Sequence, residues 1–161
     1  MSGGSVERVR AALAAAGHAD TIAAFPEGTR SAADAAAAVG CDVAQIAKSI
    51  IFRAGGRAVL VIASGANRVD VAKVAAATGL AVKRAEGGWV RDVTGFAIGG
   101  VAPLAHLTPP LVLVDADLFA LDRVWAAAGS PMHVFETTPG ALLALSGGRR
   151  ADVRVDIEEV A

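Results

Sequence analysis

Residues 95–106 read Gly95-Phe96-Ala97-Ile98-Gly99-Gly100-Val101-Ala102-Pro103-Leu104-Ala105-His106, and the rest of the chain is organised around them. The stretch is apolar enough to be buried, yet its glycines and proline allow backbone conformations that a regular strand excludes. It predicts a bent loop whose amides, those of Gly99, Gly100 and Val101, can approach a carbonyl or an oxyanion closely. A tight turn between two buried strands explains the same residues, because Gly and Pro mark turns.

The bulk composition predicts a single globular domain over residues 1–161. With 54% hydrophobic and 19% charged residues, the chain can bury a sizeable core. Its formal net charge of −1 and the lack of a Lys/Arg stripe argue against binding along duplex DNA. No apolar run approaches the ~20 residues that span a bilayer, and the N-terminus lacks the layout of a signal peptide. We therefore expect a cytoplasmic protein with no membrane partner.

No motif in the sequence indicates a metal or a cofactor. A single cysteine excludes an internal disulfide, and three scattered histidines form no metal-ligand cluster. The chain lacks the Gly-Lys-Ser/Thr of a phosphate-binding loop, and Gly99-Gly100 lacks the third glycine of a dinucleotide loop. There is also no Ser-His-Asp order with a nucleophile elbow. We expect no metal and no cofactor.

Hydrophobic spacing, caps and turn residues predict short helices mixed irregularly with short strands. The strongest strand signal is a hairpin of residues 48–53 and 58–63, and its second run is too uniformly apolar to have one wet face. Helices, the first capped by Ser5 and the second by Ser31, are predicted over residues 5–16, 32–39, 70–77, 85–93 and 139–145. Further strands are predicted over residues 21–26, 80–82, 111–114, 123–127, 132–136 and 151–155. This order favours an α+β fold with a mixed, largely antiparallel sheet.

Four strings of the sequence carry a family resemblance. They are Pro26-Glu27-Gly28-Thr29-Arg30-Ser31-Ala32-Ala33-Asp34-Ala35-Ala36, Gln45-Ile46-Ala47-Lys48-Ser49-Ile50-Ile51-Phe52, Ser64-Gly65-Ala66-Asn67-Arg68-Val69-Asp70, and the loop Gly95 to His106. Together they resemble the YbaK/EbsC group, which is similar to the editing domain inserted in bacterial prolyl-tRNA synthetases. The match runs from about Phe25 to Leu145 and keeps the order of the motifs.

The resemblance implies a free-standing aminoacyl-tRNA deacylase, which hydrolyses the ester of a wrongly charged tRNA, typically tRNA(Pro) carrying a small non-cognate amino acid. The implied partner is the aminoacyl-tRNA acceptor end, with a tRNA synthetase as a further candidate. The family fold is a mixed, partly barrel-like sheet surrounded by helices. In the family's reaction the terminal 2′-hydroxyl of the tRNA helps to activate water, and protein groups mainly bind and orient the substrate.

The resemblance also assigns candidate residues. Lys48 matches a family lysine at the head of a strand, where its ammonium would hold a phosphate or an ester oxygen. The loop from Gly99 through Gly100 and Val101 to Pro103 would bind the carbonyl, with Pro103 fixing its shape. The remaining candidates for substrate binding are Thr29, Arg30, Ser49, Ser64, Gly65 and His106.

Each candidate has a structural alternative. Lys48 could be a surface lysine at a strand end, Ser64 and Gly65 could be turn residues, and His106 could be a satisfied core residue. Two departures from the family pattern, Ala105 in place of a glycine and Ser49 in place of an asparagine, keep a second hypothesis open. In it the chain is a catalytically silent module that binds a tRNA 3′ end or an amino-acid-like ligand.

Overall fold

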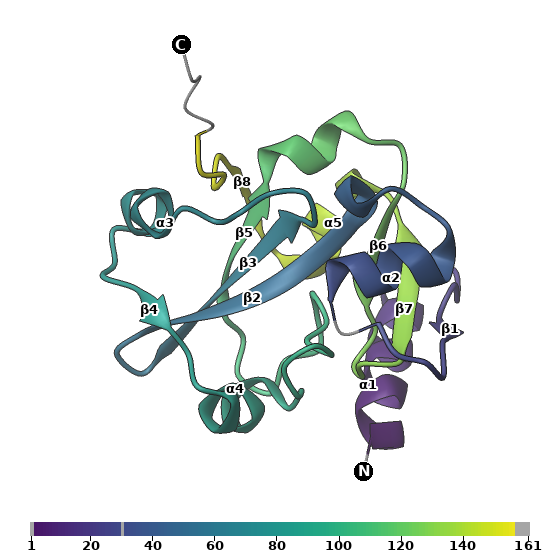
Figure 1. The fold of residues 1–161 in the computed structure, drawn as a ribbon. Coiled ribbons are helices and arrows are strands. Elements are labelled where there is room, and N and C mark those ends of the chain that lie inside the picture. The colour runs from purple at the N-terminus through teal and green to yellow at the C-terminus, as the bar shows by residue number, and fades with distance from the viewer. Residues whose placement is uncertain (1, 30, 157–161) are drawn as a thin grey trace.

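The computed structural model describes residues 2–29 and 31–156, and its centre is a long antiparallel hairpin (Figure 1). Strands β2 (Ile46–Ala54) and β3 (Arg57–Ser64) pair in a register that sets Ile51 opposite Leu60. Every residue of β3 after Arg57 is buried. The predicted hairpin is confirmed, and so is the expectation that both faces of its second strand are covered.

The other strands extend this hairpin into one mixed sheet. They are β1 (Ala23–Ala24), β4 (Lys83–Arg84), β5 (Leu111–Asp115), β6 (Val124–Ala127), β7 (His133–Thr137) and β8 (Arg149–Ala151). The order is β1-β7-β6-β2-β3-β5-β8, with β4 added beside β2. The pairs β2–β6, β3–β5 and β5–β8 are parallel, and the pairs β1–β7, β2–β3, β2–β4 and β6–β7 are antiparallel. The predicted α+β class with a mixed sheet is confirmed, and the sheet is open, with β1 and β8 at its edges.

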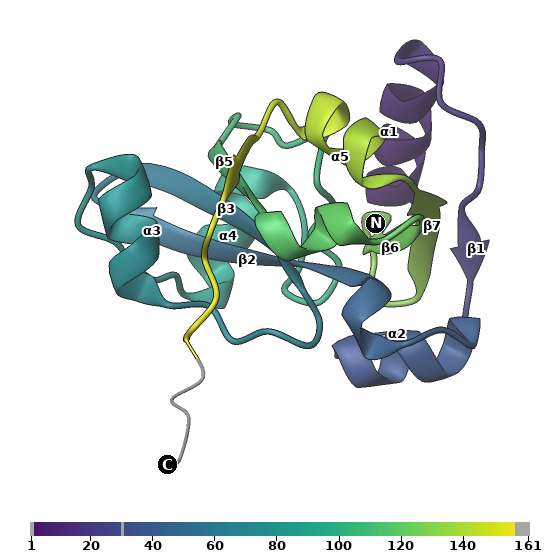
Figure 2. The same ribbon diagram turned by 90° about the horizontal axis from the view of Figure 1, so that it is seen from above.

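Helices cover the sheet on both faces, as the two ribbon views show (Figures 1 and 2). They are α1 (Ser2–Ala15), α2 (Ala32–Val39), α3 (Val71–Thr78), α4 (Gly87–Thr94) and α5 (Pro139–Ser146), with 3-10 turns η1 (Val43–Gln45) and η2 (Ala116–Ala120). The larger core packs α1, α4 and α5 against one face, and a second cluster packs Val74 of α3 against the other. A third, small cluster holds α2 over Ile46 at the start of β2. None of the helices in residues 2–29 and 31–156 is long and apolar enough to cross a membrane.

Local signals placed most of these elements correctly. Ser31 caps α2 through a hydrogen bond from the Asp34 amide to its Oγ (3.0 Å), and Gly40 ends the helix in the left-handed conformation. Gly79 ends α3 in the same way.

Among the predicted boundaries that differ from the structure, three involve contacts with distant residues. Helix α1 begins at Ser2, so Ser5 is not its cap; the Ser5 hydroxyl instead donates to the Gly129 carbonyl oxygen (2.6 Å). The strand predicted over residues 80–82 lies at Lys83–Arg84, where β2 offers pairing partners. The strand predicted over residues 151–155 lies at Arg149–Ala151, where it pairs with β5.

Candidate functional site

A hollow of about 250 Å³ lies where the start of β2 meets the glycine loop, and we call it the central hollow. Its lining residues come from α2, β2, β6, β7 and the loop, and they are Thr29, Ser31, Ala32, Ala35, Ile46, Ala47, Lys48, Ser49, Ile50, Ile98, Gly99, Val101, Trp125, Ala126, Ala127 and Val134. The walls are mostly small and aliphatic, with a few polar groups among them. This composition is typical of a site for a small ligand that is held by few directed contacts.

Lys48 supplies the positive charge of the central hollow. It is the third residue of β2 and is half-buried, and its Nζ donates to the backbone carbonyl oxygen of Asn67 (2.6 Å). Burial lowers the pKa of Lys48, and the negative charge of Asp115 opposes that change. The hydrogen bond to Asn67 holds the Lys48 Nζ in one place, at the turn that follows β3.

That turn is fixed by Asp115, a residue that the sequence analysis did not single out. The Asp115 carboxylate is 1% exposed and accepts from the Ser64 amide (3.0 Å), the Asn67 side-chain amide (2.8 Å) and the Asp117 amide (3.0 Å). Asn67 also donates from its side chain to Asp117 (2.8 Å). The only hint in the sequence is an acidic residue directly after a buried strand, which is equally typical of a helix cap.

The glycine loop contributes two of the three predicted amides. Gly99 and Val101 line the central hollow, and within residues 2–29 and 31–156 no hydrogen bond engages their amides. Gly100 has another role, because its amide donates to Ala97 (2.9 Å) and a Cβ there would lie 2.7 Å from the Ser130 backbone. Gly100 is thus required for close packing of the loop on residue 130 rather than for contact with a ligand.

Ser49 is the second polar residue of β2 in the central hollow. Its Oγ is buried and has no hydrogen-bond partner in the part of the chain that the structure describes. The residue also lines a neighbouring hollow of about 240 Å³, which Arg84 and Ala85 border. An unpartnered buried hydroxyl is costly unless a ligand satisfies it.

Of the remaining candidates for substrate binding in the first half of the chain, only one lines the central hollow. Thr29 lines the central hollow, although its hydroxyl donates to the Pro131 carbonyl oxygen (2.9 Å). Ser64 and Gly65 lie in the turn outside the lining: the Ser64 hydroxyl donates to Ala44 (2.8 Å), and a Cβ on Gly65 would lie 2.4 Å from the Val43 carbonyl oxygen. Arg30 lies outside the described residues.

Comparison with known proteins decides the family. A family model described as an aminoacyl-tRNA editing domain matches residues 26–145. This chain belongs to the aminoacyl-tRNA editing domain family. The resemblance to the YbaK/EbsC group is thereby confirmed.

Relatives of this editing domain agree with the assignment. The uncharacterized protein YwhH of Bacillus subtilis is 31% identical over 119 residues, which cover 73% of this chain and 76% of that protein. A crystal structure of a protein proposed to be a trans-editing enzyme for prolyl tRNA synthetase is 42% identical, with a TM-score of 0.89 over 94% of this chain and 98% of that one. A structure from epitope backbone grafting onto scaffold proteins is 39% identical, with a TM-score of 0.88 over 95% and 98% of the two chains.

In this editing domain, Pro103 and His106 lie apart from the central hollow. They border a separate hollow of about 180 Å³ beside Leu145. The His106 ring is held by a contact from Nε2 to the Ala102 carbonyl oxygen (2.6 Å) and by edge packing on Phe96, with centroids 5.3 Å apart. Burial lowers the pKa of His106, which keeps the ring neutral. These contacts favour a structural role for the His106 ring, although its buried Nδ1 has no hydrogen-bond partner within residues 2–29 and 31–156.

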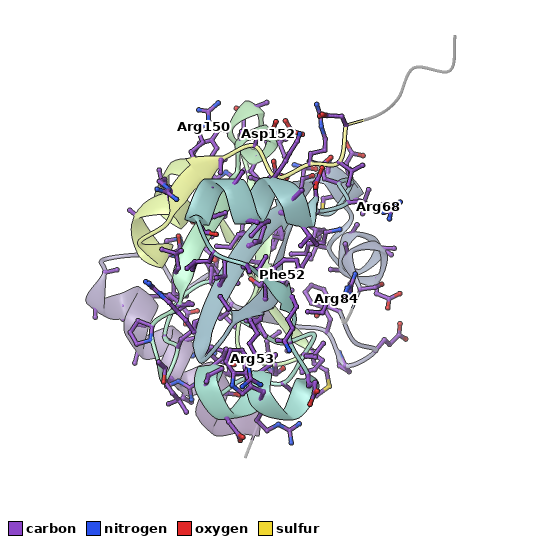
Figure 3. All side chains as sticks on the ribbon, turned by 90° about the vertical axis from the view of Figure 1, so that its left-hand side faces the viewer. Phe52, Arg53, Arg68, Arg84, Arg150 and Asp152 are labelled. Atoms are coloured by element: carbon purple, nitrogen blue, oxygen red, sulfur yellow. The ribbon has the colours of Figure 1, made fainter. Side chains whose placement is uncertain are left out.

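A fourth hollow of the editing domain, of about 220 Å³, gathers positive charge, and we call it the basic hollow. Lys48, Arg68 and Arg84 line it together with four apolar residues, Ile50, Phe52, Val69 and Val71. Figure 3 shows Arg68 and Arg84 on the same side of the molecule, near Phe52. Because Lys48 lines both hollows, the basic hollow adjoins the central one. In the described ranges, no group of His, Cys, Asp and Glu side chains is arranged to hold a metal ion.

Proposed function

We propose that this chain is a free-standing trans-editing hydrolase that deacylates mischarged aminoacyl-tRNA, with tRNA(Pro) carrying a small non-cognate amino acid as its substrate. The family match and the similarity to a protein proposed to edit for prolyl tRNA synthetase support this reading. The observation that carries it is the central hollow, where mostly aliphatic walls surround Lys48 and two loop amides that no hydrogen bond engages within residues 2–29 and 31–156.

The geometry suits ester hydrolysis by binding and orientation. Water attacks the ester carbonyl carbon, the bond from that carbon to the ribose oxygen breaks, and the ribose oxygen leaves with a proton as a hydroxyl. The amides of Gly99 and Val101 would stabilise the oxyanion that forms on the carbonyl. Lys48 would hold the ester or phosphate oxygen, and the free hydroxyl of the terminal ribose would help to activate the water.

The walls of the central hollow favour a short side chain on the amino acid. Alanines of three elements, Ala35, Ala47 and Ala126, leave space near the ammonium but offer no polar contact of their own. The unpartnered hydroxyl of Ser49 is the exception, and it would accept from or donate to the aminoacyl group. Alanine, serine, cysteine and 2-aminobutyrate are therefore the amino acids to compare.

The partner in this proposal is the acceptor end of the tRNA. Its aminoacyl group would occupy the central hollow, and phosphates of the acceptor strand would lie over the basic hollow at Arg68 and Arg84. A tRNA synthetase or another carrier would supply further selectivity, since the chain as a whole has a formal net charge of −1.

The test is deacylation of tRNA(Pro) charged with proline, alanine, serine, cysteine or 2-aminobutyrate, by the wild type and by Lys48→Ala in parallel. We expect release of a non-proline amino acid, sparing of prolyl-tRNA, and loss of activity in the variant. Equal rates in the two proteins would remove Lys48 from the mechanism. No release from any charged tRNA, with retained binding of the acceptor end, would establish the silent binding module instead.

A further inference from the structure

Asp115 is a buried carboxylate that makes no ion pair within residues 2–29 and 31–156, although both it and the Lys48 ammonium are hydrogen-bonded to Asn67. All of its hydrogen-bond donors are neutral: two backbone amides and the side-chain amide of Asn67. The nearby arginine pairs with Asp117 instead, through Arg154 Nη1 (3.0 Å). Burying a carboxylate without a paired cation costs free energy, so neutral donors alone are a poor reason for its presence.

The contacts connect Asp115 to Lys48 through a single turn. Asp115 holds both ends of the turn, through the amide of Ser64 and the side chain of Asn67. The backbone amide of Asn67 closes the turn by donating to the Ser64 carbonyl oxygen (2.9 Å). The backbone carbonyl oxygen of Asn67 accepts from Lys48 Nζ (2.6 Å). The position of the acceptor for Lys48 is therefore set by the carboxylate.

We propose that Asp115 is a positioning residue for the deacylation reaction, holding the Ser64–Asn67 turn so that Asn67 orients the Lys48 ammonium toward the central hollow. The expected effect on catalysis rests on the proposed function. The effect of Asp115 on Lys48 can be measured without any activity. Asp115 does not touch the substrate in this scheme; its effect passes through Asn67.

The charge of Asp115 has a second consequence for Lys48. The charged groups around Lys48 are Arg68 and Arg84 in the basic hollow and Asp115 at the end of β5. Partial burial disfavours the ammonium and lowers the Lys48 pKa, and Asp115 provides the negative charge that opposes this change. Replacing the Asp115 carboxylate by a neutral amide should therefore lower the Lys48 pKa further.

The first test follows the Lys48 side chain by NMR during a pH titration of the full chain. The sequence has three lysines, so Lys73 and Lys83 serve as internal references. We expect Asp115→Asn to lower the Lys48 pKa, and Asp122→Asn, a control at an exposed carboxylate outside this turn, to leave it unchanged. An unchanged Lys48 pKa in folded Asp115→Asn would overturn the proposal.

The second test keeps the carboxylate, because Asp115→Asn replaces a buried acceptor and could unfold. Asn67→Ala removes the side-chain link but retains the backbone carbonyl, and we expect kcat for deacylation to fall about 10-fold to 100-fold while the protein stays folded. A wild-type kcat in Asn67→Ala would contradict the positioning role. If the wild type itself deacylates nothing, the proposed function fails, and the NMR titration still shows whether Asp115 acts on Lys48.

Discussion

Lys48 is a half-buried cation near the start of β2, where Ser49 is the other polar residue of the central hollow, and burial of a charged side chain costs folding free energy. Because burial lowers its pKa in the folded state, the unfolded chain binds the proton more tightly. The contribution of Lys48 to folding therefore becomes more favourable as pH rises from its folded-state pKa toward the ordinary lysine value of about 10.4.

We predict that Lys48→Met reduces the rate of deacylation about 100-fold or more. The unfolding temperature at pH 7 should not fall. The variant should also lose the part of the alkaline rise in stability that Lys48 causes. Single-turnover deacylation and urea unfolding between pH 7 and pH 10 measure the two effects. A destabilised Lys48→Met would indicate a structural lysine.

Ala105 is a strained residue of the glycine loop. Its φ is +66°, and it is the one non-glycine residue with positive φ in the described part of the chain. The family pattern has glycine at this position, and Ala105 borders the hollow of Pro103 and His106 rather than the central one. Its methyl group therefore costs backbone strain and does not narrow the site.

We predict that Ala105→Gly raises the free energy of unfolding by about 0.5–1 kcal/mol and leaves deacylation unchanged. The control is Ala81→Gly, at an exposed loop residue without positive φ, which should lower stability slightly. Urea unfolding of both variants checks this. A loss of stability in Ala105→Gly would mean that the strain is absent.

At the scale of elements, α1 braces the glycine loop through Arg8. Its guanidinium donates from Nε to the Ala105 carbonyl oxygen (2.9 Å) and from Nη2 to that of Gly95 (3.2 Å). It also lies over the Phe96 ring at 4.5 Å from the centroid. One side chain of the first helix thus holds both ends of a loop about 90 residues later, whose middle lines the central hollow.

We predict that Arg8→Leu lowers the free energy of unfolding by about 2 kcal/mol, because it leaves loop carbonyls without a donor and removes the cation–π contact. The matched control is Arg10→Leu on the same helix, whose exposed guanidinium pairs with Glu7 and Asp20; its effect should be much smaller. Equal losses in the two variants, measured by urea unfolding, would refute the bracing role.

At the scale of the whole molecule, the arginine side chains differ in whether other groups of the protein contact them. Several arginine side chains are engaged by carbonyl, carboxylate or aromatic groups, namely those of Arg8, Arg53, Arg123, Arg150 and Arg154. Within residues 2–29 and 31–156, no hydrogen bond or ion pair engages the side chains of Arg68 and Arg84. Unpaired arginines on one hollow suit an anionic partner even when the net charge is slightly negative.

We predict that Arg68→Gln and Arg84→Gln each raise KM for aminoacyl-tRNA and reduce the salt dependence of log kcat/KM by about 0.7–0.9 per decade of salt. Hydrolysis of a minimal aminoacyl-adenosine ester should be unaffected. Arg57→Gln, at an exposed arginine of the hairpin turn, is the control. An unchanged salt slope in all three variants would show that the basic hollow does not contact the phosphates.

Local sequence signals determined much of this fold. The uniform apolar run of residues 58–63 predicted a strand covered on both faces, and Ser31 and Gly40 predicted both ends of α2, because caps and periodicity depend on neighbours within a few residues. Part of the candidate site followed from the same sequence through its family resemblance: Lys48, Ser49, Gly99 and Val101 all line the central hollow.

Only the tertiary structure decided which residues meet. Gly100 packs on residue 130, His106 is fixed on Phe96, and Asp115 reaches Lys48 through the turn after β3. These contacts join segments that are far apart in the chain, and they depend on the parallel register of β3 with β5 and on the packing of the loop against α1. Spacing along a single sequence carries no information on such pairings, since strand order and register are set by the burial of the whole sheet.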